Sequence, residues 1–437
     1  MSKKYPGQLF LLFFLLSHTW IAYAIPDIQT WKTDNGVPVV FVESPSLPML
    51  DLQVTFDAGG ARDGKLPGLA SLTNGLLVEG SGGLSAQEIA ERFESVGAEI
   101  KIDSLRDMAI VGVRSLTDER YLNVVIDNLK MVLSKPDFTS RAFKRDLAQM
   151  KVAVQADKQS PASIADKAFY KALYGSHPYA SPIGGTDESL DTIKRADVVR
   201  YYKQYYVAKN AQIVIVGAVS KAEAKKIANK VVEDLAEGNK PEPIPLVPDL
   251  DQAKTIHIEF PSKQSHIYVG QPGVKRGEED YFTLYVANHP FGGSGFASRL
   301  LGKIREDKGL AYSVYSYFSP MRARGPFMMG MQTKTDQKDM ALSLLKSELE
   351  SYVDAGPTKE ELKSSIDNIV GSFPLKVDSN SKLLSYLAMI GFYDLPVDYL
   401  QSFIANIENV SLSDIKEAVK RRIHPDKMVT VIVGKKG

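Results

Sequence analysis

The sequence contains no cysteine and no excess of charge of either sign. Its 437 residues include 53 lysines and arginines against 52 aspartates and glutamates. Without cysteine the chain cannot form disulfides, thiolate zinc sites, iron–sulfur clusters or a cysteine nucleophile. A net charge of +1 gives no indication of the basic face that nucleic-acid binding requires. Because 44% of the residues are hydrophobic, we expect a folded chain of two or three domains and no nucleic-acid partner.

Long apolar runs are absent except near the N-terminus. There Lys3 and Lys4 precede the eight apolar residues Leu9–Leu16, and Ala22-Tyr23-Ala24 supplies small residues for cleavage. This layout is typical of a secretory signal peptide, and the run falls short of the roughly 20 residues that span a membrane. We predict a signal peptide at residues 1–24, a mature chain with no membrane span, and a location in a Gram-negative periplasm. A retained N-terminal anchor is the alternative.

The rest of the chain contains the same unit twice. Each half opens with an alternating strand that breaks at glycine, at residues 52–59 and 266–273. Each half closes with a β-branched strand that ends in glycine, at residues 213–217 and 431–434. The two closing glycines are 217 positions apart, and a glycine shortly after each opening strand recurs after 213. Because the two spacings agree within four positions, we infer an internal duplication.

A proline-rich segment lies between the two halves. Residues 237–248 contain four prolines, which can neither continue a helix nor join a central strand. The segment therefore indicates a semi-rigid linker. We predict an N-terminal domain at 25–236, a linker at 237–252 and a C-terminal domain at 253–437.

The local patterns within each half predict the α+β class. Ser85 and Glu88 form a capping box at the start of a helix, and two candidate strands follow at 99–103 and 108–113. Apolar residues with helical spacing then run from Leu122 to Val132. Helices outnumber strands, and the strands come in adjacent pairs. We therefore expect two tandem homologous domains, each a mainly antiparallel sheet packed against helices.

Three segments resemble the insulinase/pitrilysin (inverzincin) metallopeptidases. They are Pro67–Gly80, Tyr174–Thr186 and the glycine-rich stretch Phe291–Leu301. Together with the duplication, the resemblance covers nearly all of the mature chain. It implies one half of a metallopeptidase clamshell.

The sequence departs from that family at the metal. The family's first-domain helix carries H-x-x-E-H, two zinc ligands and a general base. Here the matching positions are Ser71, Asn74 and Gly75. The family's third ligand, a glutamate, would fall near Lys151, and no glutamate occurs between Glu119 and Glu188. Because a catalytic zinc needs three protein ligands, we predict no metal in this chain and no peptidase activity by the chain alone.

The resemblance assigns a different role to Arg305 and Tyr312. In the family, an arginine and a tyrosine seven residues apart in the second domain reach the substrate across from the zinc, and these two residues match that spacing. Each also has a simpler interpretation, as a solvated charge after an apolar helix and as a core aromatic. Gly292, Gly293 and Gly295 likewise suit either a tight turn or a loop that lets a peptide approach.

The loss of the metal motif and the retention of the arginine–tyrosine pair together predict a two-subunit enzyme. We expect this chain to be the zinc-free subunit of a periplasmic heterodimeric metalloendopeptidase, whose homologous partner carries H-x-x-E-H and the Zn²⁺. Arg305 and Tyr312 would then act on peptide substrates in the partner's active site. The alternative is a non-catalytic peptide-binding or scaffold protein with the same fold.

Overall fold

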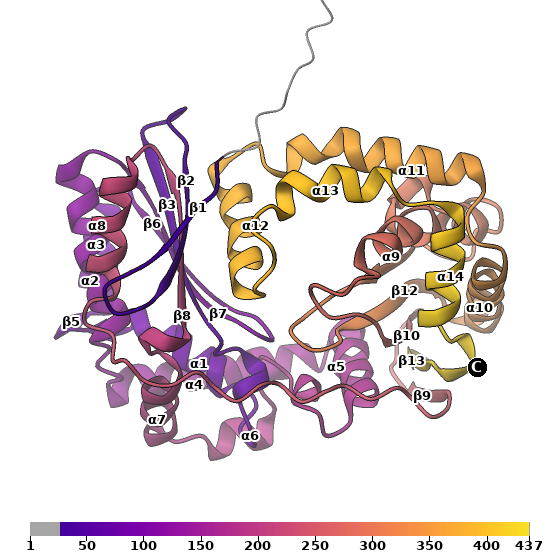
Figure 1. Cartoon of the computed structure of the whole chain (residues 1–437). Helices are drawn as coiled ribbons and strands as arrows, with labels where there is room; N and C mark the ends of the chain where they lie inside the picture. Colours follow the sequence, from indigo (N-terminus) through magenta and orange to yellow (C-terminus); the bar gives the residue numbers. More distant parts are fainter. Residues whose placement is uncertain (1–26, 437) are drawn as a thin grey trace, which may run out of the picture.

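The computed structural model describes residues 27–436, so the predicted signal peptide at 1–24 lies outside the described residues. The chain forms two halves, each a β-sheet packed against helices (Figure 1). This arrangement confirms the α+β class and the tandem pair of related domains. Among the described helices, none has the length and apolar character needed to cross a membrane.

The N-terminal half is built on a six-stranded sheet with the order β1-β2-β8-β3-β7-β6. All neighbouring strands are antiparallel except β2 and β8, which are parallel. The strands are β1 (Gln29–Lys32), β2 (Pro38–Glu43), β3 (Met49–Phe56), β6 (Glu99–Ser104), β7 (Ala109–Leu116) and β8 (Ala211–Gly217). A short hairpin, β4 (Gly80–Ser81) and β5 (Leu84–Ser85), stands apart from this sheet.

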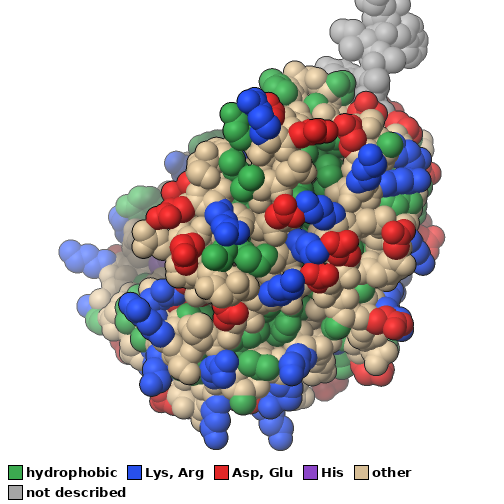
Figure 2. All heavy atoms as spheres, turned by 90° about the vertical axis from the view of Figure 1, so that its left-hand side faces the viewer, with side chains coloured by type: hydrophobic (Ala, Val, Ile, Leu, Met, Phe, Trp, Pro, Cys, Tyr) green, Lys and Arg blue, Asp and Glu red, His purple; other side chains and the backbone are tan. Residues whose placement is uncertain are grey.

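Several helices of this half pack against the sheet. The predicted capping box is present, since Ser85 and Glu88 cap each other's backbone N–H groups at the start of α2. The outer face carries interspersed basic and acidic side chains (Figure 2). Lys230 of α8 and Asp127 of α3 form an ion pair of 2.6 Å. The helices are α1 (Leu69–Gly75), α2 (Ala86–Glu94), α3 (Glu119–Ser134), α4 (Ser140–Asp157), α5 (Pro161–Tyr174), α6 (Asp187–Thr192), α7 (Arg195–Tyr205) and α8 (Lys221–Val232).

The C-terminal half repeats the plan with a five-stranded sheet in the order β11-β12-β10-β13-β9. Its strands are β9 (Lys254–Ile258), β10 (Gln264–Pro272), β11 (Ser313–Phe318), β12 (Pro326–Lys334) and β13 (Val429–Val433). Its helices are α9 (Tyr281–Asn288), α10 (Lys338–Ala355), α11 (Lys359–Ser372), α12 (Asn380–Phe392), α13 (Tyr399–Glu408) and α14 (Leu412–Arg422).

The two sheets have the same connectivity. In each half the closing strand, β8 or β13, lies in the middle of the sheet between two earlier strands of that half. It runs parallel to the first of them, β2 or β9, and antiparallel to the next, β3 or β10. The duplication read from the glycine spacing is therefore a repeat of strand order, with β1 added at one edge.

One helix of each half packs against the sheet of the other half (Figure 1). Helix α5 packs against β10 and β13 of the C-terminal sheet, and α12 packs against β2, β3 and β8 of the N-terminal sheet. Glycines allow both contacts. A Cβ on Gly270 of β10 would lie 2.9 Å from the Phe169 ring of α5, and one on Gly391 of α12 would lie 1.7 Å from the Gln212 amide of β8. The hydrophobic cores are therefore shared across the two halves.

The proline-rich segment lies along the surface of the fold. Residues 236–250 contain no helix or strand. Arg62 donates a hydrogen bond of 2.6 Å to the backbone carbonyl of Glu242, and Arg324 forms an ion pair of 2.6 Å with Asp249. The segment is therefore bound to both halves along its length.

Candidate functional site

The positions of the missing zinc motif lie on helix α1. Asp63 holds the start of this helix, because its carboxylate accepts hydrogen bonds from the backbone N–H groups of Gly68 (2.8 Å) and Ala70 (2.7 Å). Burial raises the pKa of the Asp63 carboxyl to about 7. Ser71 and Gly75 are partly exposed on α1, and Asn74 is fully buried.

Asn74 is committed to the internal structure. Its amide donates hydrogen bonds to the carbonyl oxygens of Asp103 (2.7 Å) and Ile110 (3.3 Å), and its side-chain oxygen accepts one from the Tyr206 hydroxyl (3.0 Å). The residue in the general-base position therefore ties α1 to the β6–β7 hairpin and to the end of α7.

The third zinc ligand of the family would fall near Lys151, a basic residue. Lys151 on α4 forms an ion pair of 2.6 Å with Asp191 on α6. No group of three His, Asp or Glu side chains able to hold a metal ion occurs among residues 27–436. The residues present do not fit a catalytic zinc, which needs three protein ligands and one open position.

Arg305 lies at the surface of the C-terminal half. It belongs to η7 (Leu301–Glu306), where Leu301 and Ile304 are buried and Arg305 is exposed. The guanidinium lies 5.4 Å from the ring of the exposed Phe296. It forms no ion pair with any residue in the described part of the chain.

Tyr312 is also exposed, with 61% of its surface accessible. Strand β11 begins at Ser313, and Tyr312 precedes it, with its backbone N–H donating a hydrogen bond of 3.0 Å to the Gln332 carbonyl. The interpretation of Tyr312 as a core aromatic is wrong because the side chain faces solvent.

Tyr312 lines an open surface hollow of about 900 Å³. Arg305 is not part of its lining. The charged residues around this hollow are predominantly basic, namely Lys263, Lys334, Lys338, Lys435 and Lys436 against Asp336 and Asp339.

The three glycines of the second-domain loop have different surroundings. A Cβ on Gly292 would lie 2.3 Å from the Ser316 hydroxyl, and one on Gly293 would lie 2.7 Å from the Asn288 amide. Gly295 has a φ of +61° and open space around it. Gly292 and Gly293 therefore allow close packing, whereas Gly295 makes a turn that L-residues rarely adopt. Their role in substrate binding stays a prediction.

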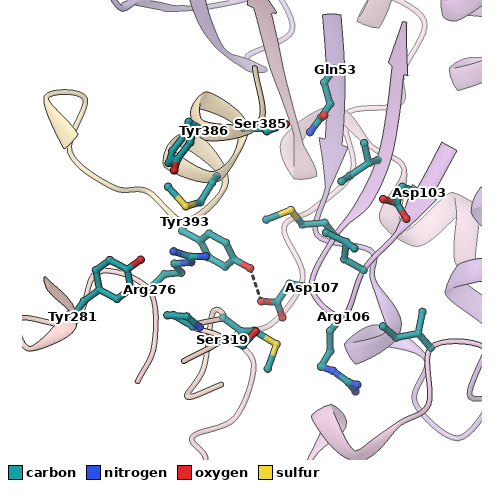
Figure 3. A pocket seen from close by; sticks show the side chains of 18 of the residues that line it. Gln53, Asp103, Arg106, Asp107, Arg276, Tyr281, Ser319, Ser385, Tyr386 and Tyr393 are labelled. Atoms are coloured by element: carbon teal, nitrogen blue, oxygen red, sulfur yellow. Dashed lines mark hydrogen bonds between the residues drawn. The ribbon is translucent and has the colours of Figure 1, made fainter. Parts of the chain in front are cut away.

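A second cavity, of about 780 Å³, lies between the two halves (Figure 3). Its wall from the N-terminal half includes Arg106 and Asp107, which lie between β6 and β7. Its wall from the C-terminal half includes Arg276 and a set of tyrosines, Tyr281, Tyr285, Tyr386, Tyr393 and Tyr399. A cavity of this size with mixed aromatic and charged lining can hold a small ligand or a short peptide segment.

Asp107 joins the two halves beside this cavity. It is 3% exposed and accepts hydrogen bonds from the hydroxyls of Tyr179 (2.8 Å) and Tyr393 (3.0 Å) and from the backbone N–H of Arg322 (2.8 Å). Burial raises the pKa of the Asp107 carboxyl above its usual value. Three donors from three separate segments therefore meet at one carboxylate.

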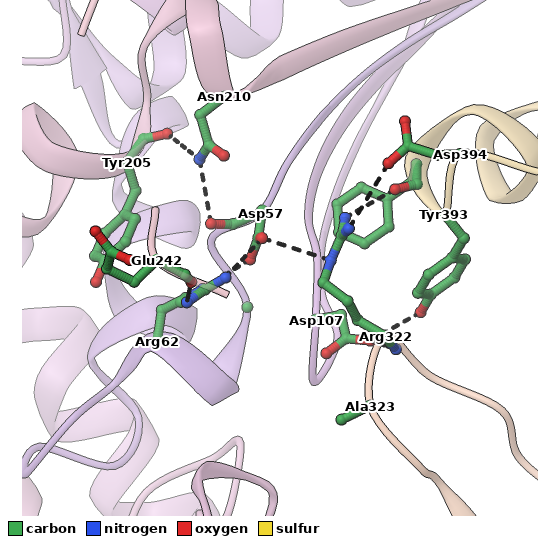
Figure 4. A network of polar contacts seen from close by, with 12 residues as sticks. Asp57, Arg62, Asp107, Tyr205, Asn210, Glu242, Arg322, Ala323, Tyr393 and Asp394 are labelled. Carbon is green, nitrogen blue, oxygen red and sulfur yellow. Dashed lines mark hydrogen bonds and ion pairs between the residues drawn. The ribbon is translucent and has the colours of Figure 1, made fainter. Parts of the chain in front are cut away.

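A chain of charges extends this junction (Figure 4). The Arg322 side chain lies 3.6 Å from the Asp57 carboxylate and donates to the Phe392 carbonyl at 2.8 Å. Asp57 in turn binds Arg62 through two hydrogen bonds, of 2.8 and 2.7 Å. Arg62 also holds the linker at Glu242.

The residues of this cavity were not predicted from the sequence. The one local signal is the pair Tyr281 and Tyr285, which are four positions apart and therefore share a face of α9. Asp107 and Tyr393 are 286 positions apart, and no spacing rule connects them.

Two family comparisons cover most of the chain. Residues 39–187 match the family described as insulinase (peptidase family M16). Residues 192–369 match the one described as peptidase M16 inactive domain.

Individual relatives agree with both matches. The chain is 28% identical over 406 residues to the non-peptidase homolog YmxG of Helicobacter pylori, covering 92% of each chain. It is similar to a crystal structure of a peptidase M16 inactive domain from Pseudomonas fluorescens, with 36% identity, a TM-score of 0.91, and coverage of 94% of this chain and 99% of that one. The fold also resembles a chain of complex III2 from Candida albicans, with 17% identity, a TM-score of 0.78, and coverage of 93% and 96%. The chain therefore belongs to the insulinase family of peptidases, family M16.

Proposed function

We propose that this chain is the zinc-free subunit of a heterodimeric zinc metalloendopeptidase and contributes Arg305 and Tyr312 to its partner's active site. The partner would be a homologous chain with an intact H-x-x-E-H motif, and it would hold the Zn²⁺. We also propose that the complex works in the periplasm, on the basis of the predicted signal peptide at residues 1–24.

The observation that carries the proposal is the exposure of Arg305 and Tyr312. Neither side chain has a hydrogen bond or ion pair to another residue within 27–436, and both are exposed. In contrast, Asn74, in the former zinc motif, is bonded on every side. The general-base position is therefore bonded within the fold, whereas the side chains of Arg305 and Tyr312 remain available to another molecule.

The chemistry of these two groups suits peptide hydrolysis. As the scissile carbonyl becomes tetrahedral, negative charge develops on its oxygen. A guanidinium and a phenol can both donate hydrogen bonds to that oxygen, and the loss of one such donor costs about 2.7–4 kcal/mol in the transition state. The lysines of the hollow that Tyr312 lines add positive electrostatic potential around the Tyr312 hydroxyl.

The test is reconstitution with a partner that carries the zinc motif. We expect the two chains to co-purify and to cleave a fluorogenic peptide only as a mixture. Arg305→Ala should lower kcat of the mixture by about 10²–10³. Lys303→Ala is the matched control, because Lys303 is an exposed cation on the same turn whose side chain pairs with Asp307 at 3.4 Å.

Wild-type activity in the Arg305→Ala mixture, with full complex formation, would reject the catalytic role. Tyr312→Phe is a second check, since it removes only the hydroxyl. A loss of complex formation in either variant would instead place the residue in the subunit interface.

The second candidate is a non-catalytic peptide-binding or scaffold protein. It is favoured by the relative from Helicobacter pylori, which is named a non-peptidase homolog. Peptide binding without cleavage in the presence of the zinc-bearing chain would favour this candidate.

A further inference from the structure

The cavity between the two halves contains a guanidinium that no other group in the described chain neutralises. Arg276 lies in the loop between β10 and α9, and its side chain points toward the cavity (Figure 3). Its Nε atom is buried and has no hydrogen-bond partner, and the side chain forms no ion pair within residues 27–436. A buried polar atom without a partner is costly, which points to a group that is present only when a ligand is bound.

The surroundings of Arg276 favour an anion. Its guanidinium carbon lies 5.7 Å from the rings of both Tyr281 and Tyr393. Arg322 lies 5.8 Å from the same Tyr393 ring, and the Lys376 amine donates a hydrogen bond of 2.9 Å to Tyr285. Arg322 is already engaged by Asp57 and by the Phe392 carbonyl, so Arg276 is the cation of this wall without an ion pair among residues 27–436. Arg276 is the one charged residue among the described lining residues from the C-terminal half.

The opposite wall does not offer such a site. Its three acids are Asp103, Asp107 and Asp166, and its two cations are Lys101 and Arg106. Arg106 is already engaged, because it donates to the carbonyls of Tyr179 (2.5 Å) and Ser181 (2.8 Å). An anion entering the cavity is therefore repelled by one wall and attracted to Arg276 on the other.

We propose that this cavity binds a carboxylate that carries an aromatic or apolar group, with Arg276 as its anchor. The guanidinium fork matches a carboxylate, and the tyrosines and Met389 offer apolar and aromatic surface to the rest of the ligand. The C-terminal end of a peptide has this chemistry, and so does a free N-acyl amino acid. The proposal is independent of the role of Arg305 and Tyr312, because it concerns binding to this chain alone.

The experiment is calorimetric titration of the isolated full chain with three probes. They are acetyl-Ala-Ala-Phe with a free carboxylate, the same peptide as its C-terminal amide, and acetyl-phenylalanine. We expect the carboxylate peptide to bind at least tenfold more tightly than the amide, as for a hydrogen bond to a charged group. Acetyl-phenylalanine binding as tightly as the peptide identifies a small carboxylate as the ligand, and weaker binding identifies a peptide end.

Variants separate this site from a general affinity for anions. Arg276→Gln should abolish the difference between carboxylate and amide, whereas Lys275→Gln, at the neighbouring exposed position, should preserve it. Ser385→Trp is the fallback variant if Arg276→Gln fails to fold. Ser385 is an exposed helix position that lines the cavity, so the tryptophan side chain should block the binding of both peptides. Equal binding of carboxylate and amide, no change in Arg276→Gln, or no binding of any probe to the wild-type chain would overturn the proposal.

Discussion

The hydroxyl of Tyr393 donates a hydrogen bond of 3.0 Å to the carboxylate of Asp107 across the boundary between the two halves. Tyr393 follows α12, the helix that packs on the N-terminal sheet, and Asp107 lies in the hairpin between β6 and β7. The same carboxylate holds Arg322 from the β11–β12 loop. One buried acid therefore fixes two segments of the C-terminal half beside the cavity.

Tyr393→Phe should lower the free energy of unfolding by about 0.5–1.5 kcal/mol, the net value of one intramolecular hydrogen bond. Asp107 keeps its two other donors in this variant, so a larger loss is not expected. Urea denaturation followed by circular dichroism measures the change. Tyr386→Phe is the control, because the hydroxyl of Tyr386 has no hydrogen bond to any described residue. Equal losses in the two variants would contradict the prediction.

Gly270→Ala should destabilise the fold, because the new Cβ would lie 2.2 Å from the backbone oxygen of Phe327 and 2.9 Å from the Phe169 ring. Overpacking of this kind costs about 1–3 kcal/mol. Gly371→Ala is the matched substitution at the end of α11, where a Cβ meets nothing within 4 Å. We expect it to stabilise the chain by up to about 1 kcal/mol, since alanine is the better helix former. Thermal unfolding of both variants tests the opposite signs.

Asn74→Ala should cost about 1–3 kcal/mol, because it leaves the Tyr206 hydroxyl and the carbonyls of β6 and β7 without their partner in a buried place. Ser71→Ala, on the same helix but partly exposed, should change stability by less than about 0.5 kcal/mol. Chemical denaturation compares the two. A small effect of Asn74→Ala would show that the motif position is free to change and is not held by the fold.

The stability of the wild-type chain should carry a pH dependence that Asp63→Asn removes. Burial raises the pKa of Asp63 from 3.8 to about 7, so between these values the folded chain holds a proton that the unfolded chain has released. The folded state then binds more protons, and this carboxyl makes the free energy of unfolding fall as pH rises from about 4 to 7. The difference between wild type and variant should change across this window and stay constant above it. Parallel curves at pH 4, 5.5, 7 and 8.5 would contradict the prediction.

Local patterns predicted the elements of the fold well, because their causes are local. The Ser85–Glu88 capping box and the strand pair at 99–113 each depend on residues a few positions apart. The duplication was visible because the closing strands end in glycine in both halves.

Long-range relationships could not be predicted in this way. The apolar residues of α5 and α12 indicate a buried face, but they do not say which sheet covers that face. The structural role of Asn74 depends on hydrogen bonds to carbonyl oxygens 29 and 36 positions away. The guanidinium of Arg276 meets the ring of Tyr393 across more than a hundred residues, and no sequence motif marks either of them.

The packing of α5 and α12 against the opposite sheets sets the order in which the chain can complete its fold. During synthesis the N-terminal sheet is complete once β8 has been made, yet one of its faces stays bare until residue 392 has followed. The N-terminal half therefore exposes an apolar sheet face to solvent for much of translation. Because each half covers part of the other half's sheet, a cut in the intervening segment should leave two pieces that stay packed together through α5 and α12.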